Sequence, residues 1–255
     1  MIIAIIIILG ALIWLLIETN WLTIRLTTNA QEPVIKLPDR RKVFGMLNAH
    51  GILGLAGILG PLILVTMDWI AAFSDPKYSL VRQSISSLAL TSKGWLQTIG
   101  FMLMGLMIES FTAGLYLNIK RRRGFGFGIA LLAFFGFDML VMGTFHTKAV
   151  GAPATFSSLV HTVAADSVFG LFPIALALIL SSIKNDRRWH RMFRYTVITG
   201  VIALVMAASQ PFLPDDFRFF GLYERIMVVN AIIWLVTFAT RLLVLSFHVC
   251  EAREI

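Results

Sequence analysis

The stretch HGILGLAGILGPLILVTMDWIAAF, residues 50–73, decides what kind of fold this chain can have. It carries one acidic residue, Asp68, and consists otherwise almost entirely of apolar and small residues. An α-helix rises about 1.5 Å per residue, so a helix of this length reaches roughly 36 Å and crosses the hydrocarbon core of a bilayer. The stretch therefore predicts a membrane-spanning helix.

Six further apolar runs extend this pattern along the chain. Together the seven candidate spans are residues 1–21, 50–73, 95–117, 125–145, 157–183, 193–213 and 226–247. The composition agrees, because 58% of the residues are hydrophobic and only 14% are charged. The predicted fold is all-α: a polytopic bundle of seven transmembrane helices. We expect residues 1–24 to form an additional N-terminal transmembrane helix, not a cleaved signal peptide, and residues 45–248 a six-helix membrane domain.

Lys and Arg residues alternate between the loops and predict the orientation of the bundle. Of the 22, 16 fall in the loops after the first, third and fifth spans and near the C-terminus, and 6 fall on the other side. Cytoplasmic loops carry the excess of Lys and Arg. We therefore expect the N-terminus outside, the C-terminus in the cytoplasm, and a multi-pass protein of the cell inner (cytoplasmic) membrane.

The formal net charge of +8 has the same explanation. The basic residues sit in short loops beside the membrane, where anionic headgroups provide the counter-charge. We therefore expect membrane lipids as partners and no nucleic acid. The glycines of residues 124–128 fit no dinucleotide fingerprint, because basic residues precede them and a span follows. The single cysteine, Cys250, excludes an intrachain disulfide and any multi-cysteine metal site.

Ionisable and polar side chains concentrate in the predicted outer half of the spans, where their depth carries information about function. Asp138 and Asp166 lie about 12–14 Å from the outer ends of neighbouring spans, with His161 above Asp166. Arg225 enters from the last span as a cationic partner. Asp68, His146, Gln210 and Glu224 fall in the same half.

These residues predict one outer pocket for a lipid headgroup or a partner membrane protein. Its members are Ser84, Ser86, Ser87, Asp138, His161, Asp166 and Arg225. We expect the side chains of Asp138, His161 and Arg225 to lie within about one water molecule of one another.

Two other interpretations of the outer polar residues stay open. Imidazole and carboxylate groups bind zinc, so His146, His161, Asp138 and Asp166 are candidate ligands of a membrane-embedded, metal-dependent hydrolase that acts on a lipid. Alternatively, these groups cap helix ends and pair with Arg225 and interfacial water. The pocket needs no cofactor, whereas the hydrolase needs zinc.

The loop before the third span is patterned like a short helix. Within residues 78–90, Tyr78, Val81, Ile85 and Leu88 share one helical face, while the serines take other faces. This pattern predicts a helix that lies flat on the bundle in the outer interface. No G-x-S-x-G sequence surrounds the serines, so a serine hydrolase lacks support.

Two further patterns concern contacts between helices. Glu109 and Arg241 descend from the outer side to a similar depth, roughly 22 Å, so we predict a buried ion pair between them. Alternatively, Arg241 extends to the cytoplasmic interface. Glycine recurs on one side of the second span, at Gly51, Gly54, Gly57 and Gly60. Small residues let helices approach closely in lipid, so we expect this side to pack against other helices.

Several short motifs point to a family. The chain reads SISSL at residues 84–88, GWLQTIGF at 94–101 with Gly105, GFD at 136–138, His161 early in its span, and GLYER at 221–225 with Trp234 and Arg241-Leu242. Over residues 45–245, this set resembles a prokaryotic integral-membrane family catalogued as domain of unknown function 998. That family often has a proline near the aspartate at the position of Asp138, and this chain has none there. The resemblance implies a membrane topology and an outer polar cluster, and no established activity.

The sequence therefore favours a non-enzymatic membrane protein that binds a lipid or a partner membrane protein. The metal-dependent hydrolase is the alternative. A proton-coupled transporter is the third interpretation, although no pair of broken helices marks it. A retinal-based pump is excluded, because residues 226–247 contain no lysine for a Schiff base.

Overall fold

Helices make up the regular structure of the part of the chain that the computed structural model describes, residues 49–149, 151–214 and 217–251. The long helices are α3 (Ala49–Ser74), α4 (Gly94–Asn118), α5 (Phe125–Thr144), α6 (Phe156–Asn185), α7 (Met192–Ser209) and α8 (Phe220–Glu251). The 3-10 helices are η2 (Ile85–Leu90) and η3 (Gln210–Phe212), which continues α7. Six spans in this part are long and apolar enough to cross a membrane, so the protein is a multi-pass membrane protein. The predicted first span, residues 1–21, lies outside the described residues.

Local sequence determines where several helices begin and end. At the start of α6, the Thr155 hydroxyl accepts the Ser158 N–H, and the Ser158 hydroxyl accepts the Thr155 N–H, which forms a capping box. Gly124 precedes α5 with φ of 85°, in the left-handed region that favours glycine. Pro211 follows α7 within η3, where proline cannot continue an α-helix.

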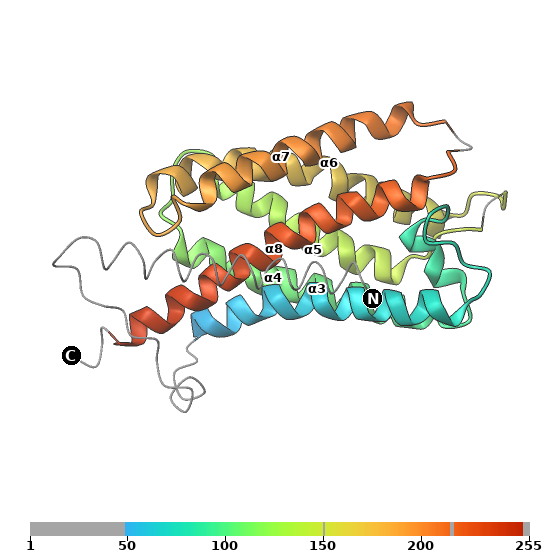
Figure 1. The fold of residues 1–255 in the computed structure, drawn as a ribbon, viewed down its shortest axis with the longest axis horizontal. Coiled ribbons are helices and arrows are strands. Elements are labelled where there is room, and N and C mark those ends of the chain that lie inside the picture. Colours follow the sequence, from blue (N-terminus) through green and yellow to red (C-terminus); the bar gives the residue numbers. More distant parts are fainter. Residues whose placement is uncertain (1–48, 150, 215–216, 252–255) are drawn as a thin grey trace.

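The six long helices form a ring (Figure 1). Helices that follow one another in the sequence pack side by side, and α8 returns to pack against α3, which closes the ring. α7 packs chiefly on α6 and only lightly on α8. We call the end that carries the loops α3–α4, α5–α6 and α7–α8 the mouth end, and the end that carries the loops α4–α5 and α6–α7 the closed end.

The glycines of α3 face its neighbours, as predicted, and all four are buried. A Cβ atom on Gly54 would lie 2.9 Å from the backbone nitrogen of Leu243. A Cβ atom on Gly57 would lie 2.7 Å from the Phe111 ring and 2.8 Å from Cβ of Ala239. The packing prediction is therefore confirmed. We call Gly54 and Gly57, with their contacts on α4 and α8, the glycine seam.

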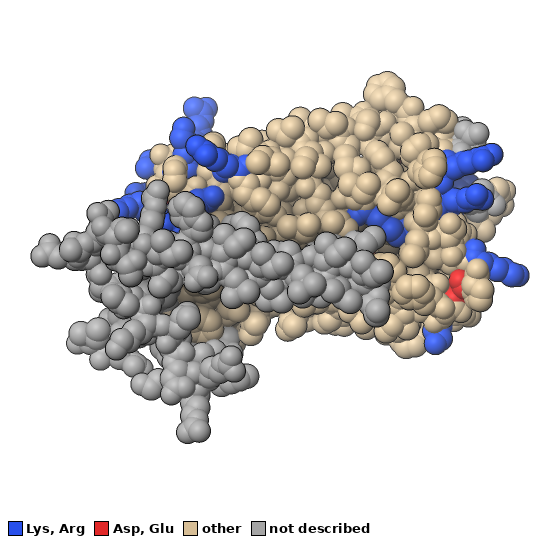
Figure 2. All heavy atoms as spheres, viewed as in Figure 1, with Lys and Arg blue, Asp and Glu red and all other residues tan. Residues whose placement is uncertain are grey.

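The surface of the bundle matches a membrane environment. Figure 2 shows Lys and Arg gathered toward the two ends of the visible face, with mostly uncharged residues between them. α7 exposes large apolar side chains along its length: Ile198, Val201, Ile202, Leu204 and Val205. In lipid, such side chains face hydrocarbon at no cost, so this face needs no protein partner to cover it.

Asp186 ties together the loops of the closed end. Its carboxylate accepts the backbone N–H groups of Lys120 and Arg188, each at 3.0 Å, and pairs with the Arg188 guanidinium at 3.1 Å. Burial opposes ionisation of this group, yet the hydrogen bonds from Arg188 and Lys120 outweigh it and lower the pKa of Asp186. The carboxylate therefore stays charged.

Glu109 and Arg241 do not form the predicted ion pair. Arg241 donates to the Arg188 carbonyl through Nε at 3.1 Å and Nη2 at 2.8 Å, which agrees with the alternative that it extends toward this end of the bundle. Glu109 faces α5, where a Cβ atom on Gly136 would lie 3.0 Å from its Oε1. Equal depth did not suffice, because Glu109 lies on the side of α4 that faces α5, away from Arg241 on α8.

Candidate functional site

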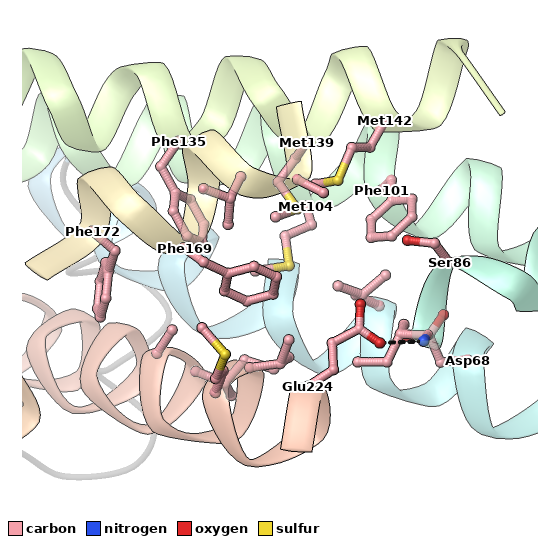
Figure 3. A pocket seen from close by; sticks show the side chains of 18 of the residues that line it. Asp68, Ser86, Phe101, Met104, Phe135, Met139, Met142, Phe169, Phe172 and Glu224 are labelled. Carbon is pink, nitrogen blue, oxygen red and sulfur yellow. Dashed lines mark hydrogen bonds between the residues drawn. The ribbon is translucent and has the colours of Figure 1, made fainter. Parts of the chain in front are cut away.

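A cavity lies inside the ring and receives side chains from all six long helices (Figure 3). The space not occupied by atoms amounts to about 730 Å³ when the open solvent at its entrance is included. Its lining is mainly apolar: eight residues are aliphatic, and eight are aromatic or sulfur-containing, namely Phe101, Phe135, Phe169, Phe172, Met104, Met139, Met142 and Met227. Flat rings and adaptable thioethers suit an apolar ligand. We call this space the apolar chamber.

A stack of aromatic side chains fills the bundle between the chamber and the closed end. Phe172, which lines the chamber, meets Trp234 edge-on at 5.8 Å between ring centroids. Trp234 stacks on Phe238 at 4.2 Å, and Phe238 stacks on Trp189 at 5.5 Å. Trp189, Trp234 and Phe238 have no exposed surface. The chamber is therefore sealed toward the closed end.

A second, polar space lies on the mouth side of the chamber and measures about 640 Å³ with the open solvent at its entrance included. Its polar lining consists of Ser84, Ser86, Thr147, His161, Thr162, Asp166, Gln210, Tyr223 and Glu224. Five residues line both spaces: Ser86, Ala165, Phe169, Glu224 and Met227. The two spaces therefore adjoin, and we call the polar one the vestibule.

Glu224 stands at the junction of the two spaces with only 9% of its surface exposed. Its Oε2 accepts the backbone N–H of Ile85 at 2.5 Å. Ile85 begins η2, where N–H groups have no partner within the helix, so Glu224 acts as the missing acceptor. Its other oxygen, Oε1, points into the chamber in Figure 3 and accepts no hydrogen bond from the described residues.

Asp68 and Gln97 complete a buried polar group beside Glu224. Gln97 has no exposed surface and donates from Nε2 to the Ile85 carbonyl at 2.5 Å. Asp68 lines the chamber from α3. Asp68 Oδ1 and Gln97 Oε1 are buried without a hydrogen-bond partner among the described residues. The sequence predicts the depth of Asp68 and Glu224 correctly and indicates no role in the pocket for either, because depth does not reveal which side of a helix faces inward.

Four of the seven residues predicted to form the outer pocket line the vestibule: Ser84, Ser86, His161 and Asp166. Ser86 is buried and also lines the chamber, toward which its hydroxyl points in Figure 3. His161 Nδ1 lies 2.7 Å from the Phe145 carbonyl, which fixes the ring. Ser87 lies outside the vestibule and lines a separate hollow at the mouth end with Lys77, Arg82 and Lys148.

Asp138 and Arg225 are not brought together with the vestibule residues. Asp138 is buried in α5 beside Ser167 of α6 and lines neither space. Arg225 Nη1 donates to three backbone carbonyls at 2.8–3.0 Å, those of Leu80, Gln83 and Gly221. Its Nη2 donates to the Tyr78 hydroxyl at 2.6 Å. Arg225 thus holds the loop before η2 and does not serve as the expected partner of Asp138 and His161.

The contacts of Tyr78 extend this anchoring of the loop. The Tyr78 hydroxyl donates to the Ser84 carbonyl at 2.7 Å while it accepts from Arg225. Burial raises the pKa of Tyr78, against the opposing effect of the Arg225 guanidinium. The phenol is therefore neutral at physiological pH and keeps the proton that it donates.

The loop before α4 packs on the bundle as predicted, but it is helical over only part of the expected range. Residues 85–90 form η2, with Ile85, Ser86 and Leu88 buried. The preceding residues form turns, and Val81 remains 42% exposed. In these preceding residues, backbone carbonyl groups accept hydrogen bonds from the side chains of Arg225 and Tyr78.

The four alternative metal ligands do not assemble into a metal site. Within the described ranges, no group of three His, Cys, Asp or Glu side chains is placed to hold a metal ion. His146 Nε2 lies 3.2 Å from the Thr98 hydroxyl at the surface, whereas His161 lines the vestibule. Asp166 also lines the vestibule, and Asp138 does not. The donor set therefore does not fit zinc in this arrangement.

Comparison with known proteins identifies a family without assigning an activity. The family described as "Protein of unknown function (DUF998)" matches residues 58–241, which is more than half of the chain. No curated protein matches the chain, and no solved structure matches it. The matched range runs from α3 into α8 and contains every residue that lines the vestibule and the chamber. The motif resemblance is confirmed, and the chain belongs to the DUF998 family of proteins of unknown function.

Proposed function

We propose that this protein binds a membrane amphiphile, with the hydrocarbon of the ligand in the apolar chamber and its polar group in the vestibule. The observation that carries the proposal is the polar space adjoining the apolar one. A molecule with one polar and one apolar end matches this division.

The charge distribution supports an outward-facing vestibule. The closed end carries the clusters of Lys120–Arg123 and Lys184–Arg194, and the positive-inside rule assigns such clusters to the cytoplasm. In this orientation the mouth end faces the outside. The chain then crosses the inner membrane seven times, with residues 1–21 as the first span and the N-terminus outside.

The proposal is tested with hexadecanol that carries a photoreactive diazirine near the end of its chain. After illumination of membranes that contain the protein, we expect adducts on chamber residues such as Met139 and Met142. Excess unlabelled hexadecanol should prevent them. Ala165→Phe fills the junction of vestibule and chamber, so it should reduce these adducts about tenfold, which corresponds to a loss of roughly 1.4 kcal/mol of binding free energy.

The matched control is Ala208→Phe, the same chemical change on the exposed side of α7. This variant should retain the chamber adducts of the wild type. Adducts confined to lipid-facing residues such as Leu204 and Val205, unchanged by Ala165→Phe, would contradict the proposed function.

A further inference from the structure

We infer that the ligand is an organic cation: a protonated amine or another organic ammonium group binds at Glu224, where the vestibule meets the chamber. The inference rests on the proposed function and adds the charge of the ligand to it. Three independent features of the site carry it: the orientation of the Glu224 carboxylate, the sign of the charges around the two spaces, and the aromatic lining.

The Glu224 carboxylate is available to a ligand on one side only. Oε2 is held by the Ile85 N–H, so the carboxylate is fixed in direction. Oε1 points into the space that Phe101, Met104 and Phe169 line, as Figure 3 shows. A carboxylate in a largely apolar space is costly to keep charged without a partner, and an ammonium group supplies both a hydrogen-bond donor and the opposite charge.

Apart from His161, the ionisable side chains that line the two spaces are acidic. Asp68 lines the chamber, Asp166 lines the vestibule, and Glu224 lines both. Among the described residues that line these spaces, there is no Lys or Arg. The nearest cation along the chain, Arg225, is engaged by three carbonyls and Tyr78 on the side of the loop. A phosphate or carboxylate headgroup would therefore meet like charge.

The lining of the chamber also suits a cation. Phe101, Phe135, Phe169 and Phe172 present rings to the chamber. The negative face of an aromatic ring attracts an ammonium group, and this attraction is strongest where water is excluded. The methionines add polarizable surface that adapts to the shape of an apolar body. An amine attached to hydrocarbon thus matches both the acidic junction and the aromatic wall.

The test measures how three compounds with the same chain displace the photoreactive hexadecanol from the chamber. Hexadecylamine, hexadecanol and hexadecyl sulfate are added at equal mole fractions in the membrane. An alkylamine is charged at pH 7, because its pKa lies near that of lysine, about 10.4. In the wild type, we expect hexadecylamine to displace the probe at about one tenth of the mole fraction that hexadecanol needs, and hexadecyl sulfate to be the weakest.

Glu224→Gln provides the decisive comparison, because glutamine still offers an oxygen to the Ile85 N–H and removes only the charge. It should abolish the preference for the amine and leave displacement by hexadecanol unchanged. Asp75→Asn is the matched control, since Asp75 lines the separate hollow at the mouth end and neither of the two spaces. This variant should keep the preference for the amine.

Each outcome separates the inference from the proposed function. Equal displacement by amine and alcohol in the wild type, or an amine preference that survives Glu224→Gln, would overturn the inference while the proposed function stands. Failure to form any chamber adduct would remove the proposed function and the inference with it. If the preference for the amine is observed, benzylamine, which lacks the long chain, distinguishes a soluble organic cation from an amine-bearing lipid as the ligand. Displacement by benzylamine as well indicates a soluble organic cation, and displacement by hexadecylamine alone indicates an amine-bearing lipid.

Discussion

At the scale of single residues, Asp186 shows how one carboxylate fixes the closed end. It receives N–H groups from two different loops and the guanidinium of Arg188. Arg188 in turn donates to the Asn118 carbonyl at 2.6 Å, at the end of α4. The charge on Asp186 therefore holds α4, α6 and the loop before α7 in a single arrangement.

Asp186→Asn should lower the melting temperature of the purified protein in detergent. Hydrogen bonds to a charged group contribute about 1.5–3 kcal/mol, and the low end applies because the Arg188 side chain is half exposed. For a chain of this size, we expect a decrease of roughly 3–6 °C. Asp75→Asn, the same change in a loop at the mouth end, should leave the melting temperature nearly unchanged.

The effect of Asp186→Asn should also depend on pH. The pKa of Asp186 is lowered in the folded state, so its stabilisation is fully present above the unfolded value of about 3.9 and is lost as the pH falls through the folded value. The difference in melting temperature between wild type and variant should therefore narrow below about pH 4. A difference that stays constant down to pH 3 would contradict the assignment.

Residue depth was predictable from sequence, whereas residue direction was not. His161, Asp166, Ser84 and Ser86 reach the vestibule as expected. Arg225 lies at the expected end of its helix, but its side chain turns toward carbonyls of the loop. The hydropathy pattern marks the ends of a span, and counting residues from an end gives the depth of each residue. Which side of the span faces the interior depends on the packing of neighbouring helices.

At the scale of secondary-structure elements, α3 depends on the glycine seam. Gly57→Ala places a methyl group 2.7 Å from the Phe111 ring and 2.8 Å from Cβ of Ala239. Overpacking of this kind costs about 1–3 kcal/mol, so we expect the melting temperature in detergent to fall by roughly 3–10 °C.

The matched control for the seam is Gly170→Ala in α6, where a Cβ atom meets nothing within 4 Å. Alanine is a better helix former than glycine, so this variant should be as stable as the wild type or more stable. An equal decrease in melting temperature in the two variants would show that Gly57 is not needed for the close approach of the helices.

Helix positions followed from hydropathy, because a span must be long and apolar whatever it packs against. The span predicted at residues 157–183 corresponds to the observed helix Phe156–Asn185, and the span predicted at 50–73 corresponds to Ala49–Ser74. The last helix was the exception: it begins at Phe220, six residues before the predicted start. These six residues include Glu224 and Arg225, whose charges place them outside the apolar run that predicted the span. In the structure both side chains are hydrogen-bonded to the segment before α4, and the helix extends through them.

At the scale of the whole molecule, the orientation can be tested by labelling single cysteines. In a Cys250→Ser background, Lys148→Cys should react with a membrane-impermeant maleimide in intact cells. Arg122→Cys should react only after the membrane is opened. Both positions are exposed, at opposite ends of the bundle. The reverse labelling pattern would place the vestibule on the cytoplasmic side.

The chamber could not be derived from the sequence, because it belongs to no single element. Its wall takes residues from six helices and η2, and these residues are ordinary apolar residues of membrane spans. Nothing in the spacing of Phe101, Phe135, Phe169 and Phe172 distinguishes them from phenylalanines that face lipid. Only closure of the ring brings them around one space.

The ring is closed by the first and the last of the described helices, and this order has a consequence for biosynthesis. A chain emerges from the ribosome N-terminus first, so α3 enters the membrane before α8 has been made. During that interval, Gly54 lacks the Leu243 backbone that it later meets, and Glu224 is not yet there to hold η2. A nascent chain arrested before residue 220 would hold five of the six helices and no enclosed chamber, so the ability to take up a ligand arises only when translation is nearly complete.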